Sequence, residues 1–400
     1  MTFVFITVFL DMVGFGLIMP VLPGLIEDVG KMDVADASLI GGWLFFAFSL
    51  TQFLFGPAMG NLSDAYGRRP LLLLAVLGLG IDYMIMALAP TLPWLFAGRL
   101  FAGFCGASYV VANAFIADIT APENRAKAFG LMGAAFGLGF VIGPAIGGLL
   151  GTFGPRIPFF VAAAVSGLNL IFGYFVLPET LPLSGRRAFQ LARANPLGTF
   201  KVFSTYKGVL PMCAVFFIYF FATSVYPAIW PFWGLAKFQW SPATIGLTLA
   251  AFGVINAVVQ GGLSGPAVKI LGERKLALIG LVTAVVAAAG YGFAYSFPLV
   301  LILLFVHGPE GFVQPMLTAI ISKEVPADAQ GEMQGGIASA QSLAILLGTV
   351  VFSQIFGYFL KPVAPFISPD IAFFIAAVIL LCALVLFLIN ATPRPEGKTQ

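Results

Sequence analysis

Five ionisable side chains lie inside long apolar runs of the sequence. They are Asp11, Asp82, Arg99, His307 and Glu310. A charge at membrane depth costs at least about 2.5–3.5 kcal/mol, so it is seldom kept without a use. These residue types predict sites that bind and release protons. The alternative is that Asp82 and Arg99 form a structural pair, or that Asp11 lies at a water-filled end of its span.

The segment His307-Gly-Pro-Glu-Gly holds two of these groups three residues apart. Residues at this spacing share a helix face if the turn survives Pro309. Histidine is the side chain that changes charge near neutral pH. The pair therefore predicts a second site, for a proton or for a cationic group of the substrate. The alternative makes His307 a packing residue and places Glu310 near the outer water.

The composition is that of a membrane protein: 60% of the residues are hydrophobic and only 9% are charged. A soluble domain carries about 25% charged residues. A spanning helix needs about 20 apolar residues. We predict an all-α integral membrane protein with twelve spans, near 3–25, 38–59, 71–89, 93–116, 127–151, 157–178, 208–230, 242–264, 276–295, 298–321, 332–360 and 371–391.

No motif for enzyme chemistry is visible in the sequence. Phosphate-binding loops, metalloprotease motifs, nucleophile elbows and metal-spaced Cys/His clusters do not occur. The three cysteines, Cys105, Cys213 and Cys382, lie in predicted spans and read as small apolar side chains. We expect no enzyme activity, no cofactor and no metal. A proton gradient is then the natural energy source for transport.

Lysines and arginines are unevenly divided between the predicted loops. If the loop at 64–69 faces the cytoplasm, the opposite side holds only Lys31, Arg156, Lys237 and Lys361, and the other loop cations are cytoplasmic. This satisfies the positive-inside rule with both termini in the cytoplasm. The asymmetry explains the net charge of +3, so no nucleic-acid partner is expected.

The chain repeats itself at a separation of 205 residues. Gly60 then meets Gly265, Gly67 meets Gly272, and Pro93 meets Pro298, among further matches. Two parallel repeats are a common design of transporters. We predict six-helix bundles at 1–180 and 207–392, a cytoplasmic linker at 181–206 and a cytoplasmic tail at 393–400.

Residues 60–70, Gly-Asn-Leu-Ser-Asp-Ala-Tyr-Gly-Arg-Arg-Pro, separate two predicted spans. We expect a short polar turn that locks helix ends by charge and hydrogen bonds. Asp64, Arg68 and Arg69 lie in it, and Asp118 and Arg125 flank the next turn on the same side. Together they predict a cytoplasmic gate. Exposed ion pairs are individually weak, which suits a gate that must reopen.

This segment resembles the signature loop of the major facilitator superfamily, G-x-L-x-D-x-x-G-R-R/K-x. Residues 99–107 are similar to the span 4 motif R-x-x-Q-G-x-G-A-A of its drug/proton antiporters, which is linked to proton coupling, although Ala102 and Cys105 depart from it. The span 5 antiporter motif G-x-x-x-G-P-x-x-G-G is matched by Gly139, Gly143, Pro144, Gly147 and Gly148. Such glycines let another helix approach closely, as at a moving interface.

Five segments resemble the tetracycline/proton antiporter group: 9–23, 63–70, 82–83, 116–118 and 135–139. That group carries an acid in span 9, whereas residues 280–290 have none. The resemblance implies the major facilitator fold and proton-coupled efflux of amphipathic drugs by alternating access. It also implies a multi-pass protein of a bacterial inner membrane, a small amphipathic substrate, contacts with lipid, and a monomer.

Polar and aromatic residues within the spans predict a substrate cavity. The candidates are Gln52, Asn113, Phe217, Tyr226, Asn256, Gln260 and Gln314. An aromatic cavity with few polar groups suits amphipathic organic molecules. The plainer interpretation is that most aromatic residues face lipid or form an interfacial belt. Two other functions stay open from the sequence: a lipid or lysolipid transporter of the same fold, and a channel or receptor.

Overall fold

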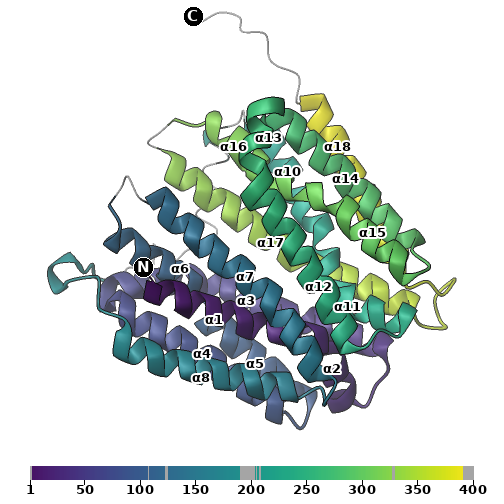
Figure 1. The fold of residues 1–400 in the computed structure, drawn as a ribbon, viewed down its shortest axis with the longest axis horizontal. Coiled ribbons are helices and arrows are strands. Elements are labelled where there is room, and N and C mark those ends of the chain that lie inside the picture. The colour runs from purple at the N-terminus through teal and green to yellow at the C-terminus, as the bar shows by residue number, and fades with distance from the viewer. Residues whose placement is uncertain are drawn as a thin grey trace, which may run out of the picture. The chain divides into compact units, whose positions relative to one another are not determined.

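The computed structural model describes residues 2–106, 108–121, 125–189, 203, 205–206, 209–326 and 329–390. Every regular element in these residues is a helix (Figure 1), which confirms the predicted all-α class. The chain forms two compact units. Unit 1 comprises Met1–Pro196, Pro227–Val254 and Thr349–Pro369, and unit 2 comprises Leu197–Tyr226, Ile255–Gly348 and Asp370–Gln400. The tail at 393–400 and most of the predicted linker lie outside the described residues.

The first part of the chain belongs wholly to unit 1. Its elements are α1 (Thr2–Ile18), η1 (Met19–Val21), α2 (Leu22–Gly30), α3 (Val34–Tyr66), α4 (Arg68–Leu88), α5 (Leu92–Cys105), α6 (Ser108–Ile119), α7 (Arg125–Gly151), α8 (Ile157–Val176) and η3 (Leu183–Gly185). Within this unit α1 packs along α7 and α8, α4 packs along α8, and α3 packs along α5.

The later helices contribute to both units. They are α10 (Leu210–Thr223), α11 (Val225–Phe238), α12 (Pro242–Ala257), η7 (Val258–Leu263), α13 (Ser264–Leu271), α14 (Glu273–Phe293), α15 (Phe297–His307), η8 (Gly308–Phe312), α16 (Val313–Lys323), α17 (Gln330–Phe359) and α18 (Ile371–Asn390). In unit 2, α14 packs against α18, α16 and η8, and α10 packs against α18.

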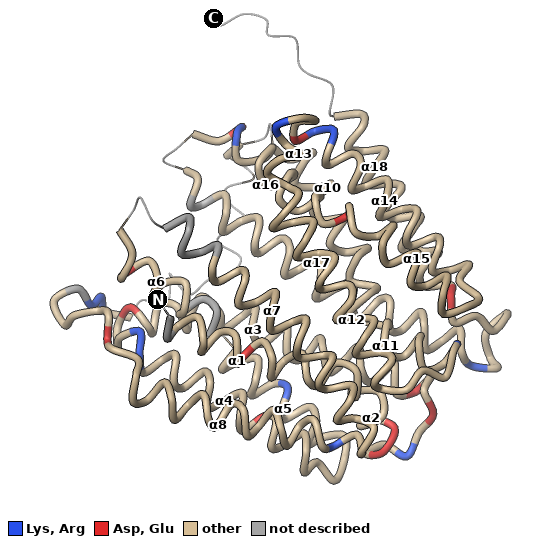
Figure 2. The backbone as a smooth tube through the Cα atoms, viewed as in Figure 1, with Lys and Arg blue, Asp and Glu red and all other residues tan. Residues whose placement is uncertain are grey.

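Eleven helical segments among the described residues are long and apolar enough to cross a membrane. The remaining predicted span, 93–116, is divided: α5 ends at Cys105 and α6 begins at Ser108. A glycine at 106 favours this break, because glycine costs about 1 kcal/mol in a helix interior relative to alanine. Charged residues gather near the helix ends, and few lie along the helices (Figure 2).

The predicted polar turn at 60–70 is wrong in its extent. Helix α3 continues to Tyr66 and α4 begins at Arg68, so Gly67 alone interrupts the helices. Its φ of 107° is a backbone conformation that favours glycine. A single residue suffices because the side chains of this segment bond one another and need no longer loop.

The sequence repeat has structural counterparts. Gly272 lies between α13 and α14 with a φ of 76°, as Gly67 lies between α3 and α4. Pro93 and Pro298 each occupy the first turn of a helix, α5 and α15. That position suits proline because its missing N–H would have no helical partner there. Both halves of the chain therefore use the same residues to start and stop corresponding helices.

Glycines allow α1 and α7 to approach until their backbones touch. A Cβ on Gly143 would lie 2.7 Å from the Val13 carbonyl oxygen, and one on Gly16 would lie 2.7 Å from Cδ of Pro144. Gly139 and Gly147 face the same helix, against Met12 and Leu17. Close packing of this kind replaces the hydrophobic effect, which gives no drive between helices in lipid.

The other face of α7 meets α12, also within unit 1. A Cβ on Gly148 would lie 3.1 Å from Cα of Gly246, and Gly246 in turn faces the Pro144 carbonyl. The span 5 motif therefore fits α7 between α1 on one side and α12 on the other. In the same unit the amide of Gln354 on α17 donates to the carbonyl of Leu39 on α3, at 3.1 Å.

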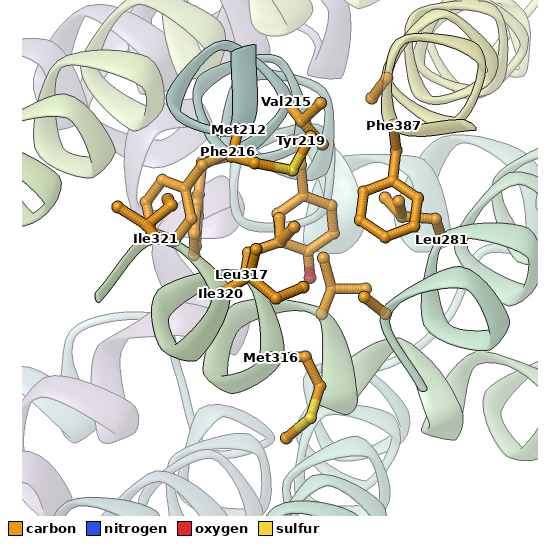
Figure 3. Packing of buried hydrophobic residues seen from close by; sticks show 14 of the residues in the cluster. Met212, Val215, Phe216, Tyr219, Leu281, Met316, Leu317, Ile320, Ile321 and Phe387 are labelled. Carbon is orange, nitrogen blue, oxygen red and sulfur yellow. The ribbon is translucent and has the colours of Figure 1, made fainter. Parts of the chain in front are cut away.

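The core of unit 2 is apolar and rich in aromatic residues. Phe216, Leu281, Leu317 and Phe387 pack together from α10, α14, α16 and α18. Tyr219 lies among them (Figure 3), with its ring in the core and its hydroxyl directed away from α10. A buried tyrosine hydroxyl usually has a hydrogen-bond partner, and the partner found here is described below.

We predict opposite effects for two alanine substitutions in α7. Gly143→Ala should lower the free energy of unfolding by about 1–3 kcal/mol, because the new methyl group collides with the backbone of α1. Gly137→Ala should leave stability equal or raise it by about 0.5–1 kcal/mol, since nothing lies within 4 Å of its Cβ position. Thermal unfolding in detergent measures both. Equal midpoints for the two variants would contradict the close contact.

Candidate functional site

Asp82 and Arg99 form a buried ion pair in unit 1. Asp82 lies on α4 and is 0% exposed, and Arg99 lies on α5 and is 7% exposed. Both carboxylate oxygens face the guanidinium, with Nε 3.3 Å from Oδ1. A Cβ at residue 98 would lie 2.8 Å from Oδ1 of Asp82, so Gly98 leaves room for the carboxylate. The pairing of Asp82 with Arg99 that the sequence left open as an alternative is therefore formed.

Asp11 lies on α1 and is 2% exposed. The side-chain amide of Asn169 on α8 donates to Oδ1 of Asp11 at 3.2 Å and to the Thr7 carbonyl at 3.0 Å. Asp11 is therefore a buried acid with an uncharged hydrogen-bond donor, which is unlike the cation beside Asp82. The burial rules out the alternative that Asp11 lies in water at an end of its span. Asn169 carries no sequence signal beyond being polar within a span.

His307 and Glu310 meet in unit 2. Helix α15 ends at His307, and a 3-10 turn, η8, follows over Gly308–Phe312. Residues i and i+3 eclipse in a 3-10 turn, which brings Nε2 of His307 to 2.5 Å from Oε2 of Glu310. The two residues are 2% and 6% exposed. The alternative that Glu310 lies in outer water is therefore wrong.

Two tyrosines complete this cluster. The hydroxyl of Tyr219 on α10 donates to Oε1 of Glu310 at 3.0 Å. The hydroxyl of Tyr291 on α14 lies 3.2 Å from Nδ1 of His307. Tyr226, a predicted cavity residue, packs its ring 4.5 Å from the imidazole. Sequence reasoning missed Tyr219 and Tyr291 as partners because they come from other helices, and the sequence does not show which helices become neighbours.

Three of the predicted gate residues, Asp64, Arg68 and Asp118, form one network at the junction of α3 and α4. Arg68 is 8% exposed. Its guanidinium lies 2.5 Å from Asp64 and 3.0 Å from Asp118 on α6, and it donates to Oγ of Ser63 at 2.6 Å. One arginine thus joins the ends of three helices.

Glu179 belongs to this network, and the sequence reasoning did not identify it. Its Oε1 accepts the backbone N–H of Arg68 at 2.9 Å, and also those of Thr180 and Leu181, each at 3.0 Å. The first N–H groups of a helix lack helical partners, so Glu179 caps α4 from the segment that follows α8. Acids are stabilising at this end of a helix.

The other two predicted gate residues differ in what the structure shows. Arg69 donates to the carbonyl of Tyr174 at 2.5 Å and lies over the ring of that residue. It therefore ties α4 to α8 and takes no part in the contacts around Arg68 that are described above. The side chain of Arg125 lies outside the described residues.

Most of the predicted cavity residues have partners within their own units. Gln52 donates to the carbonyl of Gly106 at 2.8 Å, where α5 has ended, so it satisfies the interrupted helix. Asn113 is partly buried on α6. In unit 2, Gln260 donates to Asn256 at 3.0 Å, Gln314 donates to Gln341 at 3.4 Å, and Phe217 packs against the apolar core.

These features, a bundle of apolar helices with buried charges and a glycine-rich α7, define a polytopic membrane transporter. The chain belongs to the Major Facilitator Superfamily, whose family model matches residues 4–229 and 212–400. Its members are transporters, and this chain is a multi-pass membrane protein. The family resemblance stated from the motifs is confirmed.

The chain is also similar to individual proteins of known name. It is 41% identical over 354 residues to the tetracycline resistance protein, class C, of Escherichia coli, covering 88% of each chain. It is 32% identical to the class B protein of the same organism over 98% of this chain and 96% of that one. The human organic anion transporter MFSD10 has a similar solved structure, with TM-score 0.72, 25% identity and coverage of 96% and 98%.

We predict that Glu179→Ala lowers the free energy of unfolding by about 0.5–2 kcal/mol, the usual cost of losing a helix N-cap. The matched control is Glu324→Ala, because Glu324 is exposed and lies outside this network. Thermal unfolding in detergent compares the two variants. If Glu179→Ala unfolds no earlier than Glu324→Ala, the capping role is wrong.

The buried pair generates a second prediction. Arg99→Leu leaves the carboxylate of Asp82 buried without its cation, which should cost about 3–5 kcal/mol of stability. The double variant Asp82→Leu/Arg99→Leu should recover most of this loss, since no charge is then buried. Yield and thermal unfolding in detergent test both. A double variant less stable than Arg99→Leu would contradict the account.

Proposed function

We propose that this protein exports amphipathic organic drugs in exchange for protons. The observation that carries the proposal is a buried acid, Asp11, held on α1 by an uncharged partner. A buried acid is well suited to bind a proton, since protonation removes the cost of a charge in an apolar interior. The relatives named tetracycline resistance proteins support the export of drugs.

The buried groups take two roles in this proposal. Asp11 binds the coupled proton, and Asp82 with Arg99 forms a charged pair whose strength depends on the packing of α4 against α5. His307 and Glu310 provide a further site, for a proton or for a cationic group of the substrate. Intramembrane acids and histidines commonly form such proton relays in transporters.

Alternating access requires contacts between helices that can form and break. Asp64, Arg68 and Asp118 serve as the gate, because partly exposed ion pairs are weak enough to reopen. Arg125 stays a predicted member of this gate, and Arg69 supports it from the next residue by tying α4 to α8. The backbone contacts of Gly143 and Gly148 give α7 two faces with little side-chain interlocking, on which α1 and α12 can shift.

The remaining parts of the proposal concern the membrane, the substrate and the oligomeric state. The excess of lysine and arginine on the side of Arg68 supports cytoplasmic termini, in the inner membrane of a bacterium. The substrate is a small amphipathic molecule, and the working form is a monomer surrounded by lipid. Tetracycline is one candidate substrate, and an amphipathic cation such as ethidium is another, because the span 9 acid of the tetracycline group is absent.

Transport in proteoliposomes with an imposed pH gradient tests the function. We predict that Asp11→Asn lowers gradient-driven uptake of tetracycline or ethidium about tenfold or more, which is at least about 1.4 kcal/mol. Asparagine keeps the hydrogen bond to Asn169 but cannot bind a proton, so substrate binding should persist. Binding is measured by quenching of tryptophan fluorescence, with Glu324→Gln as the control. Wild-type uphill transport in Asp11→Asn would overturn the assignment.

A further inference from the structure

The cluster around His307 is a continuous chain of four polar side chains from four helical elements. Tyr219 on α10 bonds Oε1 of Glu310, Oε2 of Glu310 meets Nε2 of His307, and Nδ1 of His307 meets Tyr291 on α14. All of these residues lie in unit 2. The chain therefore joins α10, η8, α15 and α14 through one row of hydrogen-bonding atoms.

Both oxygens of the Glu310 carboxylate have a partner in this chain. One oxygen of Glu310 lies 3.0 Å from a hydroxyl, and the other lies 2.5 Å from the imidazole. Aromatic rings lie beside the imidazole. The centroid of the Tyr226 ring is 4.5 Å from that of the imidazole, and the centroid of the Tyr291 ring is 5.7 Å from it. A cationic group of a substrate would have to displace Tyr219 or His307 to reach Glu310. A proton needs no such space.

The contact between Glu310 and His307 itself requires a proton. An imidazole nitrogen and a carboxylate oxygen 2.5 Å apart repel one another unless a proton lies between them. The proton can belong to the imidazole or to the carboxyl group. When it belongs to the imidazole, its hydrogen bond to the carboxylate is charge-assisted. A neutral imidazole with its proton on Nε2 supplies this contact, and the pair then carries one negative charge. A second imidazole proton, on Nδ1, leaves the pair with no net charge.

The tyrosines can accommodate both states. A tyrosine hydroxyl both donates and accepts. When Nδ1 of His307 lacks a proton, the hydroxyl of Tyr291 can donate to it, and when Nδ1 is protonated, the same oxygen can accept. Tyr219 donates to the carboxylate in the state with a negative charge. Loss or gain of one proton therefore leaves Nδ1 of His307 and Oε1 of Glu310 with their partners, which keeps the cost of burial low.

Among the described residues, three tyrosines contact the pair: Tyr219 on α10, Tyr226 on α11 and Tyr291 on α14. The residues of η7 include no titratable group, α18 has only Cys382, and the single cation of α16, Lys323, bonds Glu273 at 2.7 Å. Glu273 begins α14, whereas Tyr291 lies near its end.

We propose that Tyr219, Glu310, His307 and Tyr291 form a proton-binding site of unit 2 that does not contact the substrate. His307 and Glu310 share the proton, and Tyr219 and Tyr291 are positioning residues. A hydronium ion on one side of the membrane gives up its proton to the pair, and water on the other side accepts it, so one bond to hydrogen forms and one breaks. The coupling role of this site depends on the proposed proton exchange, whereas its occupancy by a proton does not.

The chain contains a single histidine, so the site can be observed directly. The full-length protein is labelled with ¹⁵N-histidine, reconstituted in lipid nanodiscs and titrated by NMR from pH 5 to pH 9. The two ¹⁵N shifts report which imidazole nitrogen carries a proton. We predict that the two ¹⁵N shifts depend on pH differently in Glu310→Gln and in the wild type, because that variant loses the carboxylate that contacts Nε2.

The tyrosines are tested by the same measurement. Tyr291→Phe should change the balance of the two neutral tautomers, since Nδ1 loses its partner, and Tyr219→Phe should move the midpoint, since Glu310 loses a donor. The matched control is Tyr295→Phe, because Tyr295 is 82% exposed. Titrations of Glu310→Gln and Tyr291→Phe that overlay the wild-type curve would overturn the proposal.

Substrate binding separates a proton site from a substrate site. We predict that ethidium and tetracycline bind to Glu310→Gln with a dissociation constant within about twofold of the wild type, while gradient-driven transport falls about tenfold. A tenfold loss of ethidium binding would instead make Glu310 a substrate ligand and overturn the proposal. Normal transport in Glu310→Gln would overturn the coupling role.

Different results would contradict the proposed function and the proposed proton site. If the wild-type protein transports neither probe in response to a pH gradient while His307 still titrates with Glu310, the function is wrong and the proton site stands. If the wild-type protein transports and the NMR titrations show no link between the two residues, the site is wrong and the function stands.

Discussion

A charge buried among apolar helices needs a partner, and in this protein nearly every such partner comes from another element. The partner of Asp82 lies on α5, and a hydrogen-bond donor to Asp11 lies on α8. Glu310 depends on α10 and α15, with η8 holding it in place. Because an unpaired charge in an apolar interior is so costly, these bonds fix how the helices lie against one another. The same bonds then become the places where protonation can alter the packing.

Close backbone approach makes such pairing possible. Gly98 leaves space beside Asp82, and Gly143 with Gly16 brings α7 onto α1. Gly308 and Gly311 allow η8 to approach Ile255 and Asn256 in unit 2. Small residues therefore serve two purposes here: they supply the van der Waals contact that holds helices together in lipid, and they leave room for polar groups between them.

The buried acids differ in ways that bear on transport. Asp82 has a permanent cation beside it, so its charge is already compensated. Asp11 has an amide, and Glu310 shares a proton with an imidazole. A transporter that exchanges protons needs groups of the latter two kinds, whose charge can change. A fixed pair such as Asp82 and Arg99 serves better to hold α4 and α5 in register.

The sequence by itself determined the helical membrane class, the family, eleven long spans and the positions of the buried charges, because apolar run length and glycine spacing are local properties. Even the meeting of His307 and Glu310 follows from a local 3-10 turn. Only the tertiary structure decided which distant side chains complete each site: Asn169 for Asp11, Tyr219 and Tyr291 for the pair, and Glu179 for the start of α4. Those partners depend on which helices become neighbours, and no local pattern of residues carries that information.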